Sequence, residues 1–132
     1  MTTAAHLILY VDDQRRACDF YTAALARSPR LDVPGMTEFE LGGGAVLGLM
    51  PIDGIRRLLG EALPDPRRGD GAPRAELYLH VDDVAASHAR ALAAGAKQLS
   101  APLSRDWGDE VSYALDPDGH VLAFARRLAD GA

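Results

Sequence analysis

The sequence has little of what several protein classes require. Its 132 residues include a single cysteine, Cys18, which excludes an internal disulfide framework and is typical of a reducing cytoplasm. The apolar runs are short and interrupted by Gly, Pro or charged residues, so none reads as a membrane span. The N-terminus lacks the basic start of a secretory signal. We therefore expect a cytoplasmic protein without a membrane partner.

Positive charge and recognisable catalytic motifs are also sparse. The formal net charge is -5, from 14 Lys and Arg against 19 Asp and Glu, and the arginine pairs are scattered among acids. Nucleic acid is therefore not an expected partner. The acidity mildly favours a cationic ligand, although a charge that serves only solubility is the commoner explanation. No Ser-His-Asp order, phosphate-binding glycine loop or Cys-x-x-Cys zinc pattern is present.

The sequence does contain an internal repeat. The segment 6–13, HLILYVDD, returns at 76–83 as ELYLHVDD, and VLGL at 46–49 returns at 121–124 as VLAF. A repeat of this length that occurs twice is too long for a solenoid unit and indicates a duplicated module. Two related modules that face each other predict a cleft between them, and clefts are where small ligands bind.

Each module is predicted to have the order β-α-β-β-β. Alternating apolar residues predict strands, and apolar stripes with a period of 3.6 predict helices. In the first module we expect a strand at 6–11, a helix at about 14–26 and strands near 30–33, 36–41 and 45–50. In the second we expect a strand at 76–81, a helix at about 83–94 and strands near 97–100, 109–115 and 121–126. The fold class is therefore α+β, with two paired β-α-β-β-β modules forming a cleft.

The chain is long enough for one domain spanning residues 1–132. Module one covers about 6–50 and module two about 76–126. The segment 51–75 has no counterpart in the second module and is rich in Pro, Gly and Arg beyond a short helix near 52–63. It is either a plain connector or a flap over the cleft.

Three groups of residues carry a family resemblance. His6, Asp12-Asp13 and Phe20-Tyr21 look like an opening strand and helix, and Val81-Asp82-Asp83 with Ala93-Ala94-Gly95-Ala96 looks like a second module. Trp107-Gly108 and Asp116-Pro-Asp-Gly-His120 look like a closing signature. In this order they resemble the vicinal oxygen chelate superfamily, which includes glyoxalase I, extradiol dioxygenases and bleomycin-resistance proteins. The resemblance covers about residues 6–126 and implies the glyoxalase/bleomycin-resistance-like fold and a homodimer.

The resemblance also implies four positions for ligands of a divalent metal such as zinc, nickel, manganese or iron. His6 and Glu76 match two of them, but Gly48 and Ala123 occupy the other two and have no donor atoms. Because tight binding of a catalytic ion usually needs three or four protein ligands, we expect that no metal cofactor is bound. The two small residues would also widen the cleft for a bulkier ligand.

Five residues are candidates for ligand binding. By strand parity, aromatic side chains would face the cleft and stack on a planar ligand, or they could fill the core or lie on the surface. Met50 would supply apolar lining, and Trp107 would gate the cleft or seal the dimer. The candidates are Tyr10, Met50, Tyr78, His80 and Trp107.

The polar candidates also have more than one interpretation. His6 and Glu76 are candidate catalytic residues that could form an acid–base couple, a salt bridge, or simply begin their strands. Glu38 and Glu40 could face inward and replace a missing metal ligand, but charged residues are mostly exposed, so we expect both to be solvated.

Three functions follow from these alternatives. The first is a metal-free protein that binds a small molecule, cationic or aromatic and drug-like, as in the bleomycin-resistance branch. The second is a divalent-metal lyase/isomerase of the glyoxalase type or a dioxygenase. The third is a metal-free enzyme that uses His6 and Glu76 as acid and base. The sequence favours the first, which is not an enzyme.

Overall fold

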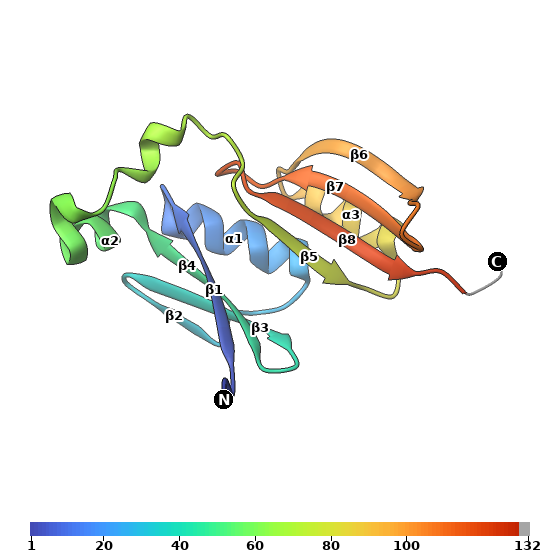
Figure 1. Ribbon diagram of the computed structural model, residues 1–132, viewed down its shortest axis with the longest axis horizontal. Coiled ribbons are helices and arrows are strands. Elements are labelled where there is room, and N and C mark those ends of the chain that lie inside the picture. The colour runs from blue at the N-terminus through green and yellow to red at the C-terminus, as the bar shows by residue number, and fades with distance from the viewer. Residues whose placement is uncertain (130–132) are drawn as a thin grey trace. The chain divides into compact units, whose positions relative to one another are not determined.

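Each half of the chain forms one four-stranded mixed sheet in the computed structural model, which describes residues 1–129 (Figure 1). The first sheet has the order β1-β4-β3-β2 and the second β5-β8-β7-β6, with β1 parallel to β4 and β5 parallel to β8. The chain divides into two compact units, one of residues 1–22 and 26–70, the other of residues 23–25 and those from 71 onward.

The β-α-β-β-β order is confirmed in both halves. The first contains β1 (Ala5–Val11), α1 (Gln14–Leu25), β2 (Leu31–Val33), β3 (Met36–Gly42) and β4 (Ala45–Pro51). The second contains β5 (Glu76–His80), α3 (Val84–Ala93), β6 (Lys97–Ser104), β7 (Asp109–Leu115) and β8 (Val121–Arg127). The fold is therefore α+β, as the alternation and periodicity of the sequence predict.

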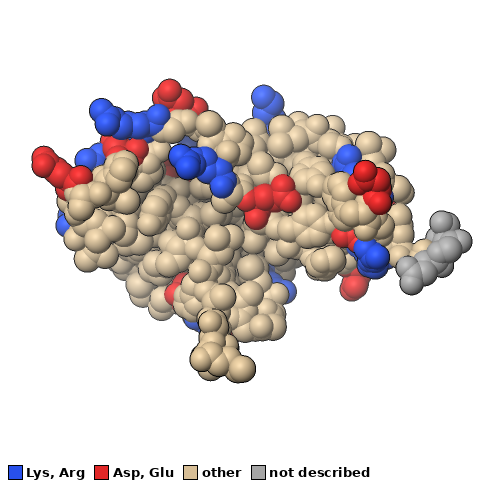
Figure 2. Space-filling view, viewed as in Figure 1, with Lys and Arg blue, Asp and Glu red and all other residues tan. Residues whose placement is uncertain are grey.

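The segment between β4 and β5 forms three short helices, and ion pairs hold part of it in place. It contains α2 (Ile52–Leu59), η1 (Gly60–Ala62) and η2 (Pro66–Gly69). The Arg67 guanidinium lies 2.8 Å from an Asp12 oxygen and 3.2 Å from an Asp53 oxygen, which anchors η2 at the end of β1. Lys and Arg are interspersed with Asp and Glu on the face shown in Figure 2. No helix within residues 1–129 is long and apolar enough to span a membrane.

The two faces of the first sheet differ because side chains alternate along a strand. Phe39 of β3 is fully buried and its ring lies 6.5 Å from that of Tyr21 on α1. The Gln14 side chain, also on α1, donates to the Thr37 hydroxyl at 2.9 Å. Odd-numbered residues of β3 therefore face α1. The opposite face, here called the His6 face, carries the even-numbered residues of β1, β3 and β4.

The second sheet is built in the same way, with α3 packed against β6, β7 and β8. Leu77, Leu122 and Ala114 are aligned across β5, β8 and β7 and are all buried. The next row is Tyr78, Ala123 and Tyr113. Because successive residues point to opposite faces, this second row lies on the other side of the sheet, here called the Tyr78 face.

The turn between β7 and β8 contains a coupled acid and histidine. One Asp116 oxygen accepts from the backbone N–H of both Asp118 and His120 at 2.9 Å, and the other lies 3.0 Å from His120 Nδ1. Burial lowers the pKa of His120, but the hydrogen bond and charge of Asp116 outweigh it, so the pKa is raised above its ordinary value. Protonated His120 is therefore stabilised in the folded state.

This raised pKa predicts a pH-dependent contribution to stability. It is fully present below the unfolded pKa of about 6.5 and is lost as the pH rises through the higher folded pKa. We expect His120→Gln to destabilise the protein more at a pH of about 5.5 than at about 8.5, as measured by urea unfolding at both pH values. A difference that does not change with pH would contradict the pairing.

Candidate functional site

The His6 face brings a histidine and a glutamate together. His6 Nδ1 lies 3.5 Å from Glu38 Oε2, and Arg30 lies 2.9 Å from the other Glu38 oxygen. We expected Glu38 and Glu40 both to be solvated. This is correct for Glu40, whose side chain is 68% exposed, and wrong for Glu38, at 15%. Glu38 is covered because Arg30 and His6 both approach its carboxylate.

Gly48 does not open space on this face. It lies in register between Ile8 of β1 and Glu38 of β3. A Cβ atom at position 48 would lie 3.1 Å from Ile8 Cγ1 and 3.3 Å from Met36 Sδ, closer than ordinary van der Waals contact. The expectation that Gly48 widens a cleft is therefore wrong, because side chains from neighbouring strands fill the space. Tyr10 and Met50, two predicted ligand-binding residues, are a half-buried register pair further along β1 and β4.

Ala123, the second small residue, is also covered. It lies in register between Tyr78 and Tyr113 and is fully buried, as are Val111 and Ala125 beside it. The two half-buried tyrosines pack against this apolar cluster. The expectation of extra room at Ala123 is therefore wrong as well. The small side chain of Ala123 instead allows the Tyr78 and Tyr113 rings to lie close to the sheet.

Three of the five predicted ligand-binding residues meet on the Tyr78 face. The Tyr78 hydroxyl accepts a hydrogen bond from Trp107 Nε1 at 3.0 Å, and the Tyr78 and His80 rings lie edge to face at 5.5 Å between centroids. Trp107 is 49% exposed. Its indole is therefore held by a hydrogen bond while about half of its surface stays exposed.

Sequence reasoning missed Asp109, the acid at the centre of this cluster. Its carboxylate accepts from the Tyr78 hydroxyl at 2.6 Å and lies 3.4 Å from Arg127 Nη1. Asp109 is 5% exposed. The alternation of residues 109, 111 and 113 along β7 places Asp109 on the same face as Tyr113, and that signal could have identified it.

The ionisation states follow from these contacts. The hydrogen bond from Tyr78, helped by Arg127, holds the pKa of Asp109 below its ordinary value. Burial raises the pKa of Tyr78, and its hydrogen bond to Asp109 raises it further. Burial also raises the pKa of Tyr113, with a contribution from the charge of Glu76. At neutral pH the face therefore carries an ionised Asp109 and two neutral phenols.

Arg105 brings a cation to the same face. Its guanidinium carbon lies 5.1 Å from the centroid of the Tyr113 ring, within the range of a cation–π contact. The guanidinium also donates to the Ser100 hydroxyl at 2.7 Å and to the Val111 carbonyl at 2.9 Å. Arg105 thus holds the Tyr113 ring from one side and balances part of the acidic charge.

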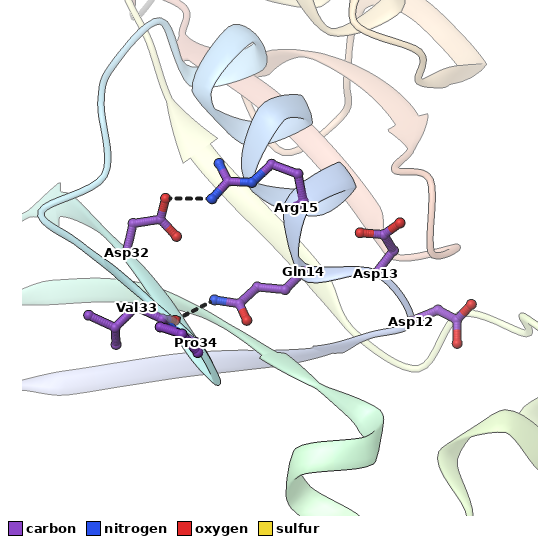
Figure 3. A pocket seen from close by; sticks show the side chains of 7 residues that line it. All are labelled: Asp12, Asp13, Gln14, Arg15, Asp32, Val33 and Pro34. Carbon is purple, nitrogen blue, oxygen red and sulfur yellow. Dashed lines mark hydrogen bonds and ion pairs between the residues drawn. The ribbon is translucent and has the colours of Figure 1, made fainter.

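A separate pocket of about 610 Å³ lies where α1 begins. The Arg15 guanidinium reaches Asp32 at 3.0 Å, and the Gln14 side chain donates to the Val33 carbonyl at 2.8 Å (Figure 3). Its lining groups thus bind one another and tie the β2–β3 turn to α1, so we assign this pocket a structural role. It is lined by Asp12, Asp13, Gln14, Arg15, Asp32, Val33 and Pro34.

The side chains do not fit the metal that the resemblance implies. Within residues 1–129, no group of three or more His, Cys, Asp or Glu could hold a metal ion. Gly48 and Ala123 supply no donor, and neighbouring side chains cover both positions. Of the two retained positions, His6 is paired with Glu38, and Glu76 is exposed at the start of β5.

Comparison with known proteins supplies the family. Residues 3–124 match the model of the Glyoxalase/Bleomycin resistance protein/Dioxygenase superfamily. An uncharacterized protein of Mycobacterium bovis is 32% identical over an alignment 129 residues long, which covers 92% of this chain and 82% of that protein.

Solved structures share the fold. A glyoxalase-related enzyme from Fulvimarina pelagi superposes with a TM-score of 0.80 at 23% identity, over 96% of this chain and 89% of its own. A glyoxalase/bleomycin resistance protein/dioxygenase from Nocardioides does so with a TM-score of 0.77 at 22% identity, over 99% of this chain and 87% of its own. At these identities the likeness shows the fold alone.

Proposed function

Because the chain belongs to the Glyoxalase/Bleomycin resistance protein/Dioxygenase superfamily, we propose that it is a metal-free protein that binds a planar aromatic small molecule. The observation that carries this proposal is the aromatic cluster on the Tyr78 face. Tyr78 contacts both His80 and Trp107 there, and half the Trp107 surface is exposed. Such rings bind planar molecules by offset or edge-to-face stacking.

The surroundings of the cluster support the same function. Val111, Ala123 and Ala125 form a dry apolar base beneath Tyr78 and Tyr113. A few oriented polar groups on an apolar surface are what small-molecule sites usually contain. The ionised Asp109 and the electron-rich ring faces favour a ligand with a positive charge, whereas Arg105 and Arg127 limit that preference. The ligand's aromatic character is thus more strongly specified than its charge.

The chain offers a direct probe of binding, because Trp107 is its only tryptophan. Its indole N–H gives a single resonance in heteronuclear NMR spectra. We expect naphthylmethylamine to shift this resonance saturably, whereas cyclohexylmethylamine, with the same charge but no aromatic ring, leaves it unchanged. Naphthoate and a neutral naphthalene alcohol then report how much charge matters.

Variants test whether the probe that shifts the Trp107 resonance binds at the Tyr78 face. We expect Tyr78→Leu to weaken probe binding by about tenfold, the loss expected for one aromatic stacking contact. Leu58→Ala, at an exposed position on α2, is the matched control and should bind as the wild type does. If no planar aromatic probe of the panel shifts the Trp107 resonance saturably, the proposed function is wrong.

A second candidate is a divalent-metal lyase/isomerase or dioxygenase, and one observation favours it. Glu38 is aligned with Gly48, and its carboxylate lies 3.5 Å from His6, so it could substitute for the missing acid. The test is the zinc, nickel, manganese and iron content of the protein after incubation with each ion and dialysis. Stoichiometric metal that is lost in His6→Ala and Glu38→Ala, but kept in Glu40→Ala, would favour this enzyme over the metal-free binder.

The homodimer implied by the family resemblance is part of the proposal. Light scattering on the eluting peak of a size-exclusion column tests it. A mass near twice the 14.1 kDa of one chain is expected.

A further inference from the structure

Trp107 is held at both its backbone and its side chain. Its carbonyl accepts a hydrogen bond from Arg127 Nη1 at 2.9 Å, and its indole Nε1 donates to the Tyr78 hydroxyl at 3.0 Å. Asp109 joins these two contacts, because one of its oxygens accepts from Tyr78 at 2.6 Å and the other lies 3.4 Å from Arg127 Nη1. The four residues therefore form a closed ring of hydrogen bonds around a half-exposed indole.

The backbone next to Trp107, at Gly108, packs directly against the Arg127 guanidinium. Gly108 has a φ of +94°, and a Cβ atom there would lie 2.9 Å from Arg127 Nη1 and 3.0 Å from its Cζ. Only a residue without a side chain therefore leaves room at position 108 for the guanidinium. The Leu128 N–H also donates to the Gly108 carbonyl at 2.9 Å, which fixes the end of β8, where Arg127 lies.

We propose that Arg127 and Asp109 are positioning residues that hold the Trp107 indole in its ligand-binding orientation before a ligand arrives. The inference rests on the proposed function, in which the indole contacts the ligand. An exposed loop tryptophan otherwise samples several rotamers and must be ordered on binding, which costs affinity. Holding it beforehand removes that cost, so the two residues act on affinity without touching the ligand.

The first test uses protein without ligand. Arg127→Gln and Asp109→Asn are compared with Arg126→Gln, an exposed arginine on the neighbouring position of β8 that points to the other side of the sheet. We expect the first two to speed hydrogen exchange of the Trp107 indole N–H by roughly tenfold, as for loss of one hydrogen bond. They should also lower its fluorescence anisotropy, and Arg126→Gln should change neither.

A second variant disrupts the same hydrogen bonds of Arg127 without removing a charged group. Gly108→Ala places a methyl group where the guanidinium lies, so we expect Arg127 to be displaced and the indole to be released in the same way. Arg127→Lys retains the charge beside Asp109 and should restore part of the protection. Thermal unfolding of every variant shows whether each remains folded, so a global loss of structure is recognised.

The third measurement is affinity for the neutral naphthalene alcohol, because removing the charge of Arg127 would by itself favour a cationic probe. We expect Arg127→Gln and Gly108→Ala to weaken this affinity about three- to tenfold, whereas Arg126→Gln binds as the wild type does. Unchanged indole exchange and anisotropy in both folded variants would overturn the positioning role even if the probe binds. A released indole with undiminished affinity would overturn it too. If the wild type binds no aromatic probe, the proposed function fails separately, while the ligand-free data still decide whether Arg127 and Asp109 hold Trp107.

Discussion

Replacing Ala123 with glutamate is expected to lower the free energy of unfolding by about 3–5 kcal/mol. Ala123 is fully buried and in register between Tyr78 and Tyr113. A longer side chain would force the two rings away from the sheet, and overpacking alone costs about 1–3 kcal/mol. The carboxylate would also be buried without a partner, which adds a desolvation penalty. Urea unfolding measures the sum.

The control is the same new residue at an exposed position. Lys97 lies on β6 with its side chain exposed. Lys97→Glu should therefore change the free energy of unfolding by less than about 1 kcal/mol. If Ala123→Glu is equally mild, the tyrosines do not cover position 123 and the description of the Tyr78 face is wrong.

The equivalent position in the first half should behave differently. At Gly48 a new Cβ would meet Ile8 Cγ1 and Met36 Sδ, which belong to flexible side chains, and Ile8 is 41% exposed. These groups can move, and loss of a strand glycine is itself mildly stabilising. Gly48→Ala should therefore change the stability by less than about 1 kcal/mol.

Positions 48 and 123, at which the family resemblance implies metal ligands, thus differ in what surrounds them. Glutamate at position 48 would displace flexible side chains and face the like-charged Glu38 in register, whereas glutamate at position 123 disrupts a packed aromatic pair. Recovering the four-ligand metal site that the family resemblance implies would therefore need changes in Tyr78 or Tyr113 as well. Those residues belong to the aromatic cluster, so the proposed metal-free binding face and the implied metal site exclude each other at Ala123.

Local sequence patterns predicted the elements well, since alternation and turn residues act within one strand or helix. They predicted the order β-α-β-β-β and placed Tyr78 and His80 on one face of β5. The last part of β6 was missed. This strand continues to Ser104 past Pro102, which is tolerated because β6 is an edge strand with irregular register.

What could not be predicted depends on neighbouring strands. The space at Gly48 is filled by Ile8 from β1 and Met36 from β3, and no pattern within β4 records that. The partial burial of Glu38 likewise depends on Arg30 and His6. The hydrogen bond from the Trp107 indole to Tyr78 joins a loop to a strand 29 residues away in sequence, so only the tertiary structure shows that the two side chains are in contact.

Phe39→Ala is expected to lower the free energy of unfolding by about 3–5 kcal/mol, the range for removing a buried phenylalanine side chain. Phe39 is fully buried, and its ring lies 6.5 Å from that of Tyr21. Its loss would leave a cavity between β3 and α1 that the strands on either side of β3 cannot close without losing their own register. Urea unfolding should show the loss as a lower midpoint with an unchanged slope.

Glu40→Ala is the matched control, because it is one residue away on the opposite face and 68% exposed. We expect it to cost less than about 1 kcal/mol, as for other exposed ion pairs. The comparison also bears on the His6 face, since Phe39 holds the strand that carries Glu38. If Phe39→Ala lowers the free energy of unfolding no more than Glu40→Ala does, the packing of Phe39 against α1 does not fix β3. That packing would then not account for the 3.5 Å distance between His6 and Glu38.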